Sequence, residues 1–208
     1  MNRTEKILTL IDRLGVVSVR QLHEILRLGT YRNTCRVINK LSPYLHEVRS
    51  REKIVYLNKV GRELIASDKE VKKSILFDHM LLANDAYIYF SCPHDWQTEH
   101  VIESHTEAAH YFSIQVKGLT STQTKKVIAD ATFSRNGYLY LIEIDNTRHM
   151  ADNVKKVKRY KEMWTDIQKK ANMQPILYFI TVSQNRKRKL QAATKGLRAE
   201  VLTFEEIR

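Results

Sequence analysis

The stretch from Lys126 to Tyr160 constrains the fold of this chain more than any other part of the sequence. Residues 127–133 are rich in β-branched side chains, and residues 138–144 form a second run of strand-forming residues. Between them stands Asn136-Gly137, the strongest short signal for a two-residue β-hairpin turn. A long basic helix is expected to follow over residues 149–168. The stretch therefore predicts a strand, a turn, a second strand and a helix.

Three acidic residues gather on this predicted hairpin, with Asp130 in the first strand and Glu143 and Asp145 ending the second. Because strand side chains alternate between faces, Glu143 and Asp145 point the same way, and pairing across the hairpin would bring Asp130 beside them. Clustered carboxylates at strand ends suit a hard cation such as Mg²⁺. Such acids are also commonly solvated or paired with Lys and Arg, so both interpretations stay open from the residues alone.

The net charge of the chain indicates which kinds of partner it can bind. Its 208 residues carry a net charge of +12, with a pI near 9.7, which favours nucleic acid or an anionic membrane surface. No run approaches the length of a membrane span, and residues 1–13 are charged and amphipathic, so we expect a cytoplasmic protein. Cys35 and Cys92 have no metal-site spacing, and we expect two buried thiols that form neither a zinc site nor a disulfide.

The basic excess is concentrated in residues 1–67, which hold 13 Lys and Arg against 6 Asp and Glu. Apolar residues at helical spacing predict three helices there, with Gly15 ending the first and with Ser18 and Thr30 capping the next two. Two short strands with a basic tip and a further helix over 59–66 follow. The outward face of the third helix carries side chains that suit base edges and phosphates: Tyr31, Arg32, Asn33, Arg36, Asn39 and Lys40.

Three helices followed by a β-hairpin resemble a winged helix-turn-helix domain over residues 3–67. The resemblance implies that Arg32, Asn33 and Arg36 enter the major groove of double-stranded DNA. It implies that the hairpin places three further residues near phosphate or the minor groove, namely Arg49, Arg51 and Lys53. A solvated charged face and a protein-docking module are the alternatives to this interpretation.

Residues 68–208 predict a separate α/β domain. An apolar helix over 75–90 is expected to pack on this domain, and a strand over 96–103 carries Glu99 as a fourth acid. The helix over 149–168 is expected to bury a stripe formed by Val154, Val157, Tyr160, Trp164 and Ile167. A strand, a basic helix and a last strand follow over 176–204. This order fits a three-layer α/β/α domain, so the chain is α+β overall.

The order of elements, with Asp130 and then Glu143, resembles the restriction-endonuclease-like core, in which an Asp and an E-x-K motif hold Mg²⁺ and activate water. The resemblance implies a metal-dependent nuclease with five candidate catalytic residues: Glu99, Asp130, Glu143, Asp145 and Lys156. The chain departs from that core at a decisive position, because Asp145 stands where the core has Lys. Lys155 or Lys156, on the following helix, would have to replace it.

The chain resembles the replication-relaxation family more closely. That family combines a winged helix with a W-x-x-E strand, a P-D strand, an E-x-D strand end and a K-x-x-x-Y helix. These appear here as Trp96 to Glu99, Ala129-Asp130, Glu143-Ile144-Asp145 and Lys156 to Tyr160, with Ala129 in place of the usual Pro. The resemblance implies a role in plasmid or conjugative-element replication, or in DNA relaxation, in Gram-positive bacteria.

The leading hypothesis is a non-catalytic DNA-binding protein that controls replication, relaxation or transcription of a plasmid, phage or conjugative element. It has a winged-helix domain over 1–67, a nuclease-like domain over 68–208 and no membrane partner. A homodimer fits a helix-turn-helix protein that binds palindromic half-sites. One alternative is a Mg²⁺-dependent nuclease or nickase that uses Asp130, Glu143 and Asp145. Another is an adaptor that recruits a relaxase or a replication initiator.

Overall fold

The computed structural model describes residues 2–49, 52–71, 77–106, 123–146 and 148–208. These residues form a mixed α+β protein with seven α-helices and two β-sheets. The chain divides into two compact units, Met1–Cys92 with Ile207–Arg208, and Pro93–Glu206. In the described ranges no helix combines the length and apolar character needed to cross a bilayer.

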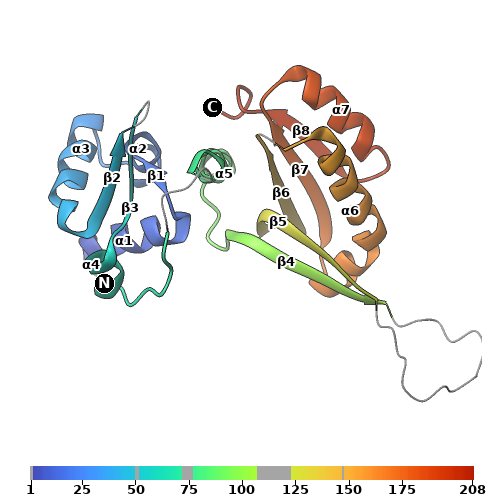
Figure 1. The fold of residues 1–208 in the computed structure, drawn as a ribbon, viewed down its shortest axis with the longest axis horizontal. Coiled ribbons are helices and arrows are strands. Elements are labelled where there is room, and N and C mark those ends of the chain that lie inside the picture. The colour runs from blue at the N-terminus through green and yellow to red at the C-terminus, as the bar shows by residue number, and fades with distance from the viewer. Residues whose placement is uncertain (1, 50–51, 72–76, 107–122, 147) are drawn as a thin grey trace, which may run out of the picture. The chain divides into compact units, whose positions relative to one another are not determined.

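The first unit contains five α-helices and a three-stranded antiparallel sheet of order β1-β3-β2 (Figure 1). Its elements are α1 (Arg3–Leu14), β1 (Val17–Ser18), α2 (Val19–Leu26), α3 (Tyr31–Lys40), a 3-10 turn η1 (Ser42–Tyr44), β2 (Leu45–Arg49), β3 (Lys53–Leu57), α4 (Lys59–Leu64) and α5 (Phe77–Tyr89). The predicted order of three helices, a hairpin and a helix is confirmed. The two-residue strand β1 was not predicted, since so short a strand leaves no periodic pattern.

The helix boundaries follow from their capping residues. Gly15 ends α1 with a φ of 78°, a conformation that glycine adopts without a Cβ penalty. Ser18 accepts a hydrogen bond from the Gln21 N–H, and Thr30 accepts one from the Asn33 N–H, so both predicted N-caps are confirmed. These caps fix where α2 and α3 begin, and hence which side chains α3 exposes.

Helix α5 belongs to the first unit, although the sequence pattern assigns it to the second domain. Its inward side carries Asn84, which donates to the Val16 carbonyl at 2.6 Å, and Asp85, which accepts from Gln21 Nε2 at 2.7 Å. The contact boundary therefore lies after Cys92, and the predicted boundary at residue 67 falls inside the first unit. The apolar pattern of α5 predicts that the helix is buried but does not show which unit it packs on. The polar contacts of Asn84 and Asp85 show that it packs on the first unit.

The second unit is built on a five-stranded sheet of order β4-β5-β6-β7-β8. Its elements are β4 (Gln97–Thr106), β5 (Gln123–Arg135), β6 (Tyr138–Asp145), α6 (Met150–Ala171), β7 (Gln174–Thr181), α7 (Gln184–Thr194) and β8 (Ala199–Thr203). The strands β4, β5 and β6 pair antiparallel, and β6, β7 and β8 pair parallel. Every helix and strand predicted for this part of the chain is present.

The helices α6 and α7 contact each other and cover the same face of this sheet (Figure 1). Right-handed crossovers between the consecutive parallel strands β6, β7 and β8 require this placement. Within its described residues the second unit therefore has two layers, which corrects the predicted three-layer arrangement. The apolar helix that was expected to pack on this domain is α5, which the contacts place in the first unit.

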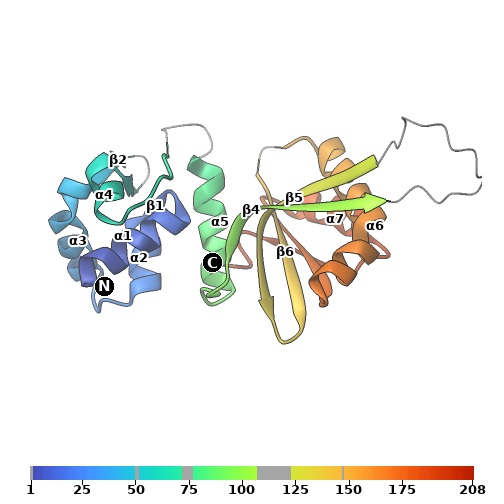
Figure 2. The same ribbon diagram turned by 90° about the horizontal axis from the view of Figure 1, so that it is seen from below.

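The β5–β6 hairpin has the predicted turn (Figure 2). Asn136 and Gly137 have φ values of 52° and 78°, the positive values that a type I′ turn needs at both central positions. The flanking residues Arg135 and Tyr138 pair, and the ladder continues to Ala131 and Ile142. This register sets Asp130 at the level where β6 carries Glu143.

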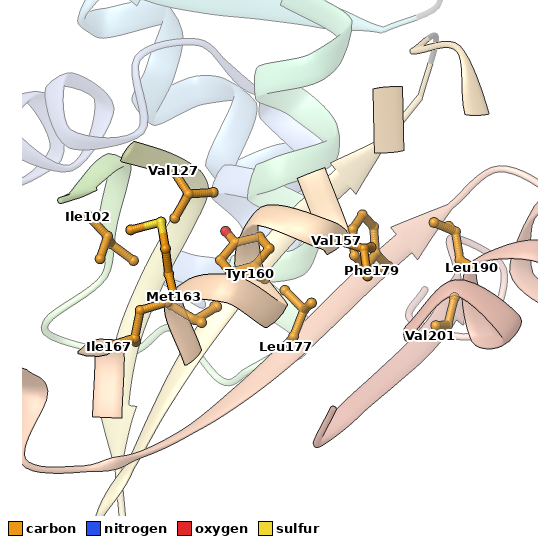
Figure 3. Packing of buried hydrophobic residues seen from close by; sticks show 11 residues of the cluster. Ile102, Val127, Val157, Tyr160, Met163, Ile167, Leu177, Phe179, Leu190 and Val201 are labelled. Carbon is orange, nitrogen blue, oxygen red and sulfur yellow. The ribbon is translucent and has the colours of Figure 1, made fainter. Parts of the chain in front are cut away.

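The core of the second unit lies between α6 and the sheet (Figure 3). Val157, Tyr160, Met163 and Ile167 point from α6 onto strand residues such as Ile102, Val127, Leu177 and Phe179. The predicted stripe is correct at three positions, at Val157, Tyr160 and Ile167. It is wrong at Val154, which is 46% exposed, because Asn153 takes the inward position one residue earlier. Trp164 packs only at the edge of this core.

Candidate functional site

Asp130 on β5, Glu143 on β6 and Lys156 on α6 form a cluster of charged side chains that we call the acid–lysine cluster. Lys156 Nζ donates a hydrogen bond to Glu143 Oε2 and lies 3.6 Å from Asp130 Oδ1. Asp130 also accepts the Ile144 N–H at 2.7 Å. The sequence predicts the two acids as neighbours, and the structure shows one lysine between them.

Glu143 is the most deeply buried member of this cluster, with a side chain only 1% exposed. Tyr160 donates its hydroxyl to Glu143 Oε1 at 2.6 Å, and Arg148 lies 3.8 Å from Oε2. Burial raises the pKa of Glu143 to about 8, and the charge of Asp130 adds to this rise, while Lys156 and Tyr160 oppose it. A carboxyl with this pKa exchanges its proton near neutral pH, which suits general acid–base chemistry.

Tyr160 is held as a hydrogen-bond donor. Burial and then the charge of Glu143 raise the pKa of Tyr160 well above its ordinary value, so its hydroxyl stays protonated. The sequence pattern places Tyr160 in the core stripe but does not show this bond. The available signal is the spacing of Lys156 and Tyr160, because residues four apart lie on one helix face.

Asp145 lies on the same side of β6 as Glu143 but belongs to a different network. Arg186 on α7 makes two hydrogen bonds to it, at 2.7 and 2.5 Å, Thr181 donates at 2.6 Å and Asn153 at 2.7 Å. Burial alone would raise the pKa of Asp145, but these hydrogen bonds lower it below its ordinary value. Asp145 thus acts as a buried structural anion that joins β6, α6, β7 and α7.

The structure therefore separates the three acids that the sequence pattern groups into one metal site. Asp130 and Glu143 share Lys156, whereas Asp145 is saturated by Arg186, Thr181 and Asn153. Among the residues described here, no group of three or more His, Cys, Asp or Glu side chains is arranged to hold a metal ion. Asp130 and Glu143 are the only two of the predicted ligands that the structure brings together.

A groove of about 740 Å³ opens beside the acid–lysine cluster. It is lined by Glu99, Val101, Lys126, Val127, Ile128, Asp130, Arg148, Asp152, Lys155, Lys156 and Arg159. Five basic side chains stand against three acidic ones, so the groove favours an anion. Glu99 faces Asp130 across the β4–β5 pairing and has a φ of 51°, which is unusual for a strand residue. Of the lining cations, Arg148 was missed at the sequence level, since it lies in a loop without periodicity.

The exposed side of α3 carries the predicted DNA-contact residues of the first unit. We call it the α3 surface, and it consists of Tyr31, Arg32, Asn33, Arg36, Asn39 and Lys40. All of these are exposed except Asn33, which is half-buried. Most of them also line a groove of about 670 Å³ along the helix. Cys35 borders that groove, and Cys35 and Cys92 are free thiols that are only partly buried, whereas the sequence pattern predicts buried ones.

The β2–β3 hairpin lies next to the α3 surface and is tied to it by Lys53. Lys53 Nζ donates to Asn39 Oδ1 at 2.9 Å and lies 2.6 Å from Glu47 Oε1. Arg49 is exposed at the end of β2, and Arg51 lies outside the described residues. Lys53 was predicted as a DNA-contact residue, and here it holds the hairpin against α3.

The comparisons with known proteins fit this arrangement. The model of the replication-relaxation family matches residues 8–177, which include most of the first unit, the acid–lysine cluster and both grooves. No curated protein and no solved structure gives a significant match. Since the family model covers well over half of the sequence, the chain belongs to the replication-relaxation family.

Proposed function

We propose that this protein binds double-stranded DNA through the α3 surface and the β2–β3 hairpin. In this proposal it acts in the replication or relaxation of a plasmid, phage or conjugative element. The observation that carries the proposal is the α3 surface, where Arg32, Arg36 and Lys40 stand exposed on one side of a capped helix. An α-helix fits the major groove of B-DNA, and Arg and Lys are the side chains that contact guanine edges and phosphates.

Charge and family membership support this assignment independently. The net charge of +12 gives the protein a long-range attraction to a polyanion such as DNA. The description of the family links the chain to replication and relaxation, both of which are processes of DNA. Within the proposal the three helices and the hairpin work as a winged helix, with α3 as the helix that enters the groove.

The second unit has a non-catalytic role in this proposal. Lys156 is paired with both Asp130 and Glu143 within the protein, and Asp145 is paired with Arg186. The cationic lining of the adjacent groove supplies additional attraction for a phosphate backbone. The restriction-endonuclease-like order of its strands then serves as a scaffold.

The test is the salt dependence of duplex binding by the full chain. We expect the logarithm of the binding constant to fall linearly with the logarithm of salt concentration. Arg49→Ala should weaken binding to all sequences about equally and reduce this slope by roughly one, as expected for one lost phosphate contact. If the folded full chain binds no duplex at low salt, the proposal fails.

A second candidate function is a metal-dependent nuclease, and the position of Lys156 favours it. The restriction-endonuclease-like core needs a lysine beside its acids, and this chain has Asp145 at the usual place. Lys156 approaches the same two acids from α6 instead. Asp130 and Glu143 would hold Mg²⁺ with water and phosphate oxygens completing its shell, and the bound ion would supply an activated water.

Incubation of supercoiled DNA with the protein separates the two functions. If the protein nicks DNA in Mg²⁺ or Mn²⁺ but not in EDTA, Lys156→Ala and Glu143→Gln should abolish the cleavage. Lys169→Ala is the matched control, because Lys169 is exposed on the same helix and does not line the groove. Binding without cleavage by the wild-type protein would support the non-catalytic role.

A further inference from the structure

Two residues of the α3 surface are connected to each other and to the loop before the helix. Arg36 Nη2 donates to Asn33 Oδ1 at 2.9 Å, and Asn33 Nδ2 donates to the Leu28 carbonyl at 2.7 Å. Thr30 Oγ1 accepts the Asn33 backbone N–H at 3.2 Å. A chain of hydrogen bonds thus runs from the start of α3 to the Arg36 guanidinium.

These bonds change the role expected of Asn33. An asparagine that recognises adenine must accept from N6 through Oδ1 and donate to N7 through Nδ2. In Asn33 both groups already have partners within the protein, and the side chain is half-buried. Asn39 is engaged in a similar way, because its Oδ1 accepts from Lys53. An amide oxygen has two lone pairs and an amide nitrogen has two N–H groups, so these bonds fix the orientation of each asparagine without using its full capacity.

Arg36 retains most of its hydrogen-bonding capacity. A guanidinium has five N–H donors in a planar fork, and the bond to Asn33 uses one of them. Its side chain is exposed on the α3 surface. The remaining donors match the O6 and N7 acceptors of guanine, whereas adenine presents a donor at the corresponding position. Because Asn33 already orders the guanidinium, less side-chain freedom is lost on binding.

On the basis of the proposed function above, we propose that Arg36 selects a guanine in the major groove and that Asn33 is its positioning residue. The ligand of the α3 surface is then a duplex with a required guanine at one position. Arg32 and Lys40 contribute attraction to the backbone that does not depend on this base.

The experiment begins with selection of tight-binding duplexes from a random pool by the full chain. The selected guanine is then replaced by 7-deazaguanine, which lacks the N7 acceptor and keeps the Watson–Crick pair. We expect the wild-type protein to bind the natural site about five- to hundredfold more tightly than a site with another base there, and to lose part of this preference with 7-deazaguanine. Arg36→Ala should bind all three sites equally.

Two further variants separate base recognition by Arg36 from the effect of its charge and from the effect of its positioning by Asn33. Arg36→Lys keeps the positive charge but lacks the planar fork that Asn33 orients, so it should retain affinity and lose part of the preference for guanine. Asn33→Ala keeps the guanidinium but frees it, so the preference should fall part of the way. Lys40→Ala is the control and should weaken binding to every site while leaving the ratio unchanged. Thermal unfolding of each variant confirms that the first unit is folded.

The possible failures are distinguishable. A folded wild-type chain that binds no duplex contradicts the proposed function itself. Duplex binding without a selected guanine, or a preference that persists in Arg36→Ala, overturns the inference and leaves the proposed function standing. A wild-type preference in Asn33→Ala removes the positioning role of Asn33.

Discussion

At the scale of single residues, Glu143 is the group whose protonation should be visible in the whole protein. Its pKa of about 8 lies above its ordinary value of 4.5, so the folded state binds this proton more tightly than the unfolded state. The contribution of this bound proton to the stability of the folded protein is complete below pH 4.5 and is lost as the pH rises through about 8. We expect the free energy of unfolding of the wild type to fall relative to that of Glu143→Gln across this range, by on the order of 5 kcal/mol.

Chemical denaturation at several pH values measures this difference. Other groups titrate in both proteins, so the difference between the two curves isolates the carboxyl of Glu143. Parallel curves between pH 5 and pH 9 would mean that Glu143 is ionised throughout and that its pKa is not raised.

Asp145 leads to a prediction about stability. Removal of Arg186 leaves a buried carboxylate without its cation, a change that typically costs about 3–5 kcal/mol. We expect Arg186→Ala to lower the free energy of unfolding by roughly this amount. Arg188→Ala on the same helix is the matched control, because Arg188 is exposed and should change stability by less than about 0.5 kcal/mol. Equal effects of the two variants would show that the Asp145 network contributes little.

Single residues also show which pairings in the site the sequence cannot predict. Alternation along a strand correctly places Glu143 and Asp145 on one face of β6. It does not reveal that Lys156 pairs with the first acid and Arg186 with the second, because these cations come from helices whose approach depends on tertiary packing. The structure brings Asp130 and Glu143 together with the predicted candidate Lys156 and places Asp145 in a separate network. The catalytic and metal-binding roles of these residues stay predictions.

At the scale of elements, α4 depends on one glycine. A Cβ on Gly61 would lie 2.2 Å from the Tyr44 carbonyl oxygen, so α4 can pack against η1 only without a side chain at this position. We expect Gly61→Ala to destabilise the first unit by about 1–3 kcal/mol, the usual cost of overpacking. Val60→Ala on the same helix should be nearly neutral, since Val60 is 52% exposed. Thermal unfolding measures both, and an unchanged midpoint for Gly61→Ala would contradict the close packing.

Elements with strong local signals were predictable. Asn136-Gly137 specifies the type I′ turn because both positions need positive φ, and Ser18 and Thr30 specify helix starts because their side chains accept backbone N–H groups. The phase of α6 was less certain, since apolar Val154 and polar Asn153 compete for one inward position. Asn153 takes it because it bonds to the buried Asp145, and a hydropathy pattern cannot show this.

At the scale of the whole molecule, the mixed α+β class was predictable, but the assignment of α5 was not. The periodicity of α5 shows only that the helix is buried, whereas Asn84 and Asp85 fix it in the first unit through bonds to Val16 and Gln21. The contact units therefore differ from the predicted domains by residues 68–92, which include this helix, and by Ile207–Arg208. The α3 surface lies wholly within the first unit, so the proposed DNA contact does not depend on how the units are arranged.

The most direct test of the proposed DNA contact compares two double variants with equal charge. Arg32→Ala with Arg36→Ala removes two cations from the α3 surface, and Arg188→Ala with Lys189→Ala removes two exposed cations from α7. The affinity of each full chain for duplex DNA is measured at one salt concentration. We predict that the α3 variant loses at least tenfold more affinity than the α7 variant. Equal losses would mean that binding follows net charge alone and would contradict the proposed role of the α3 surface.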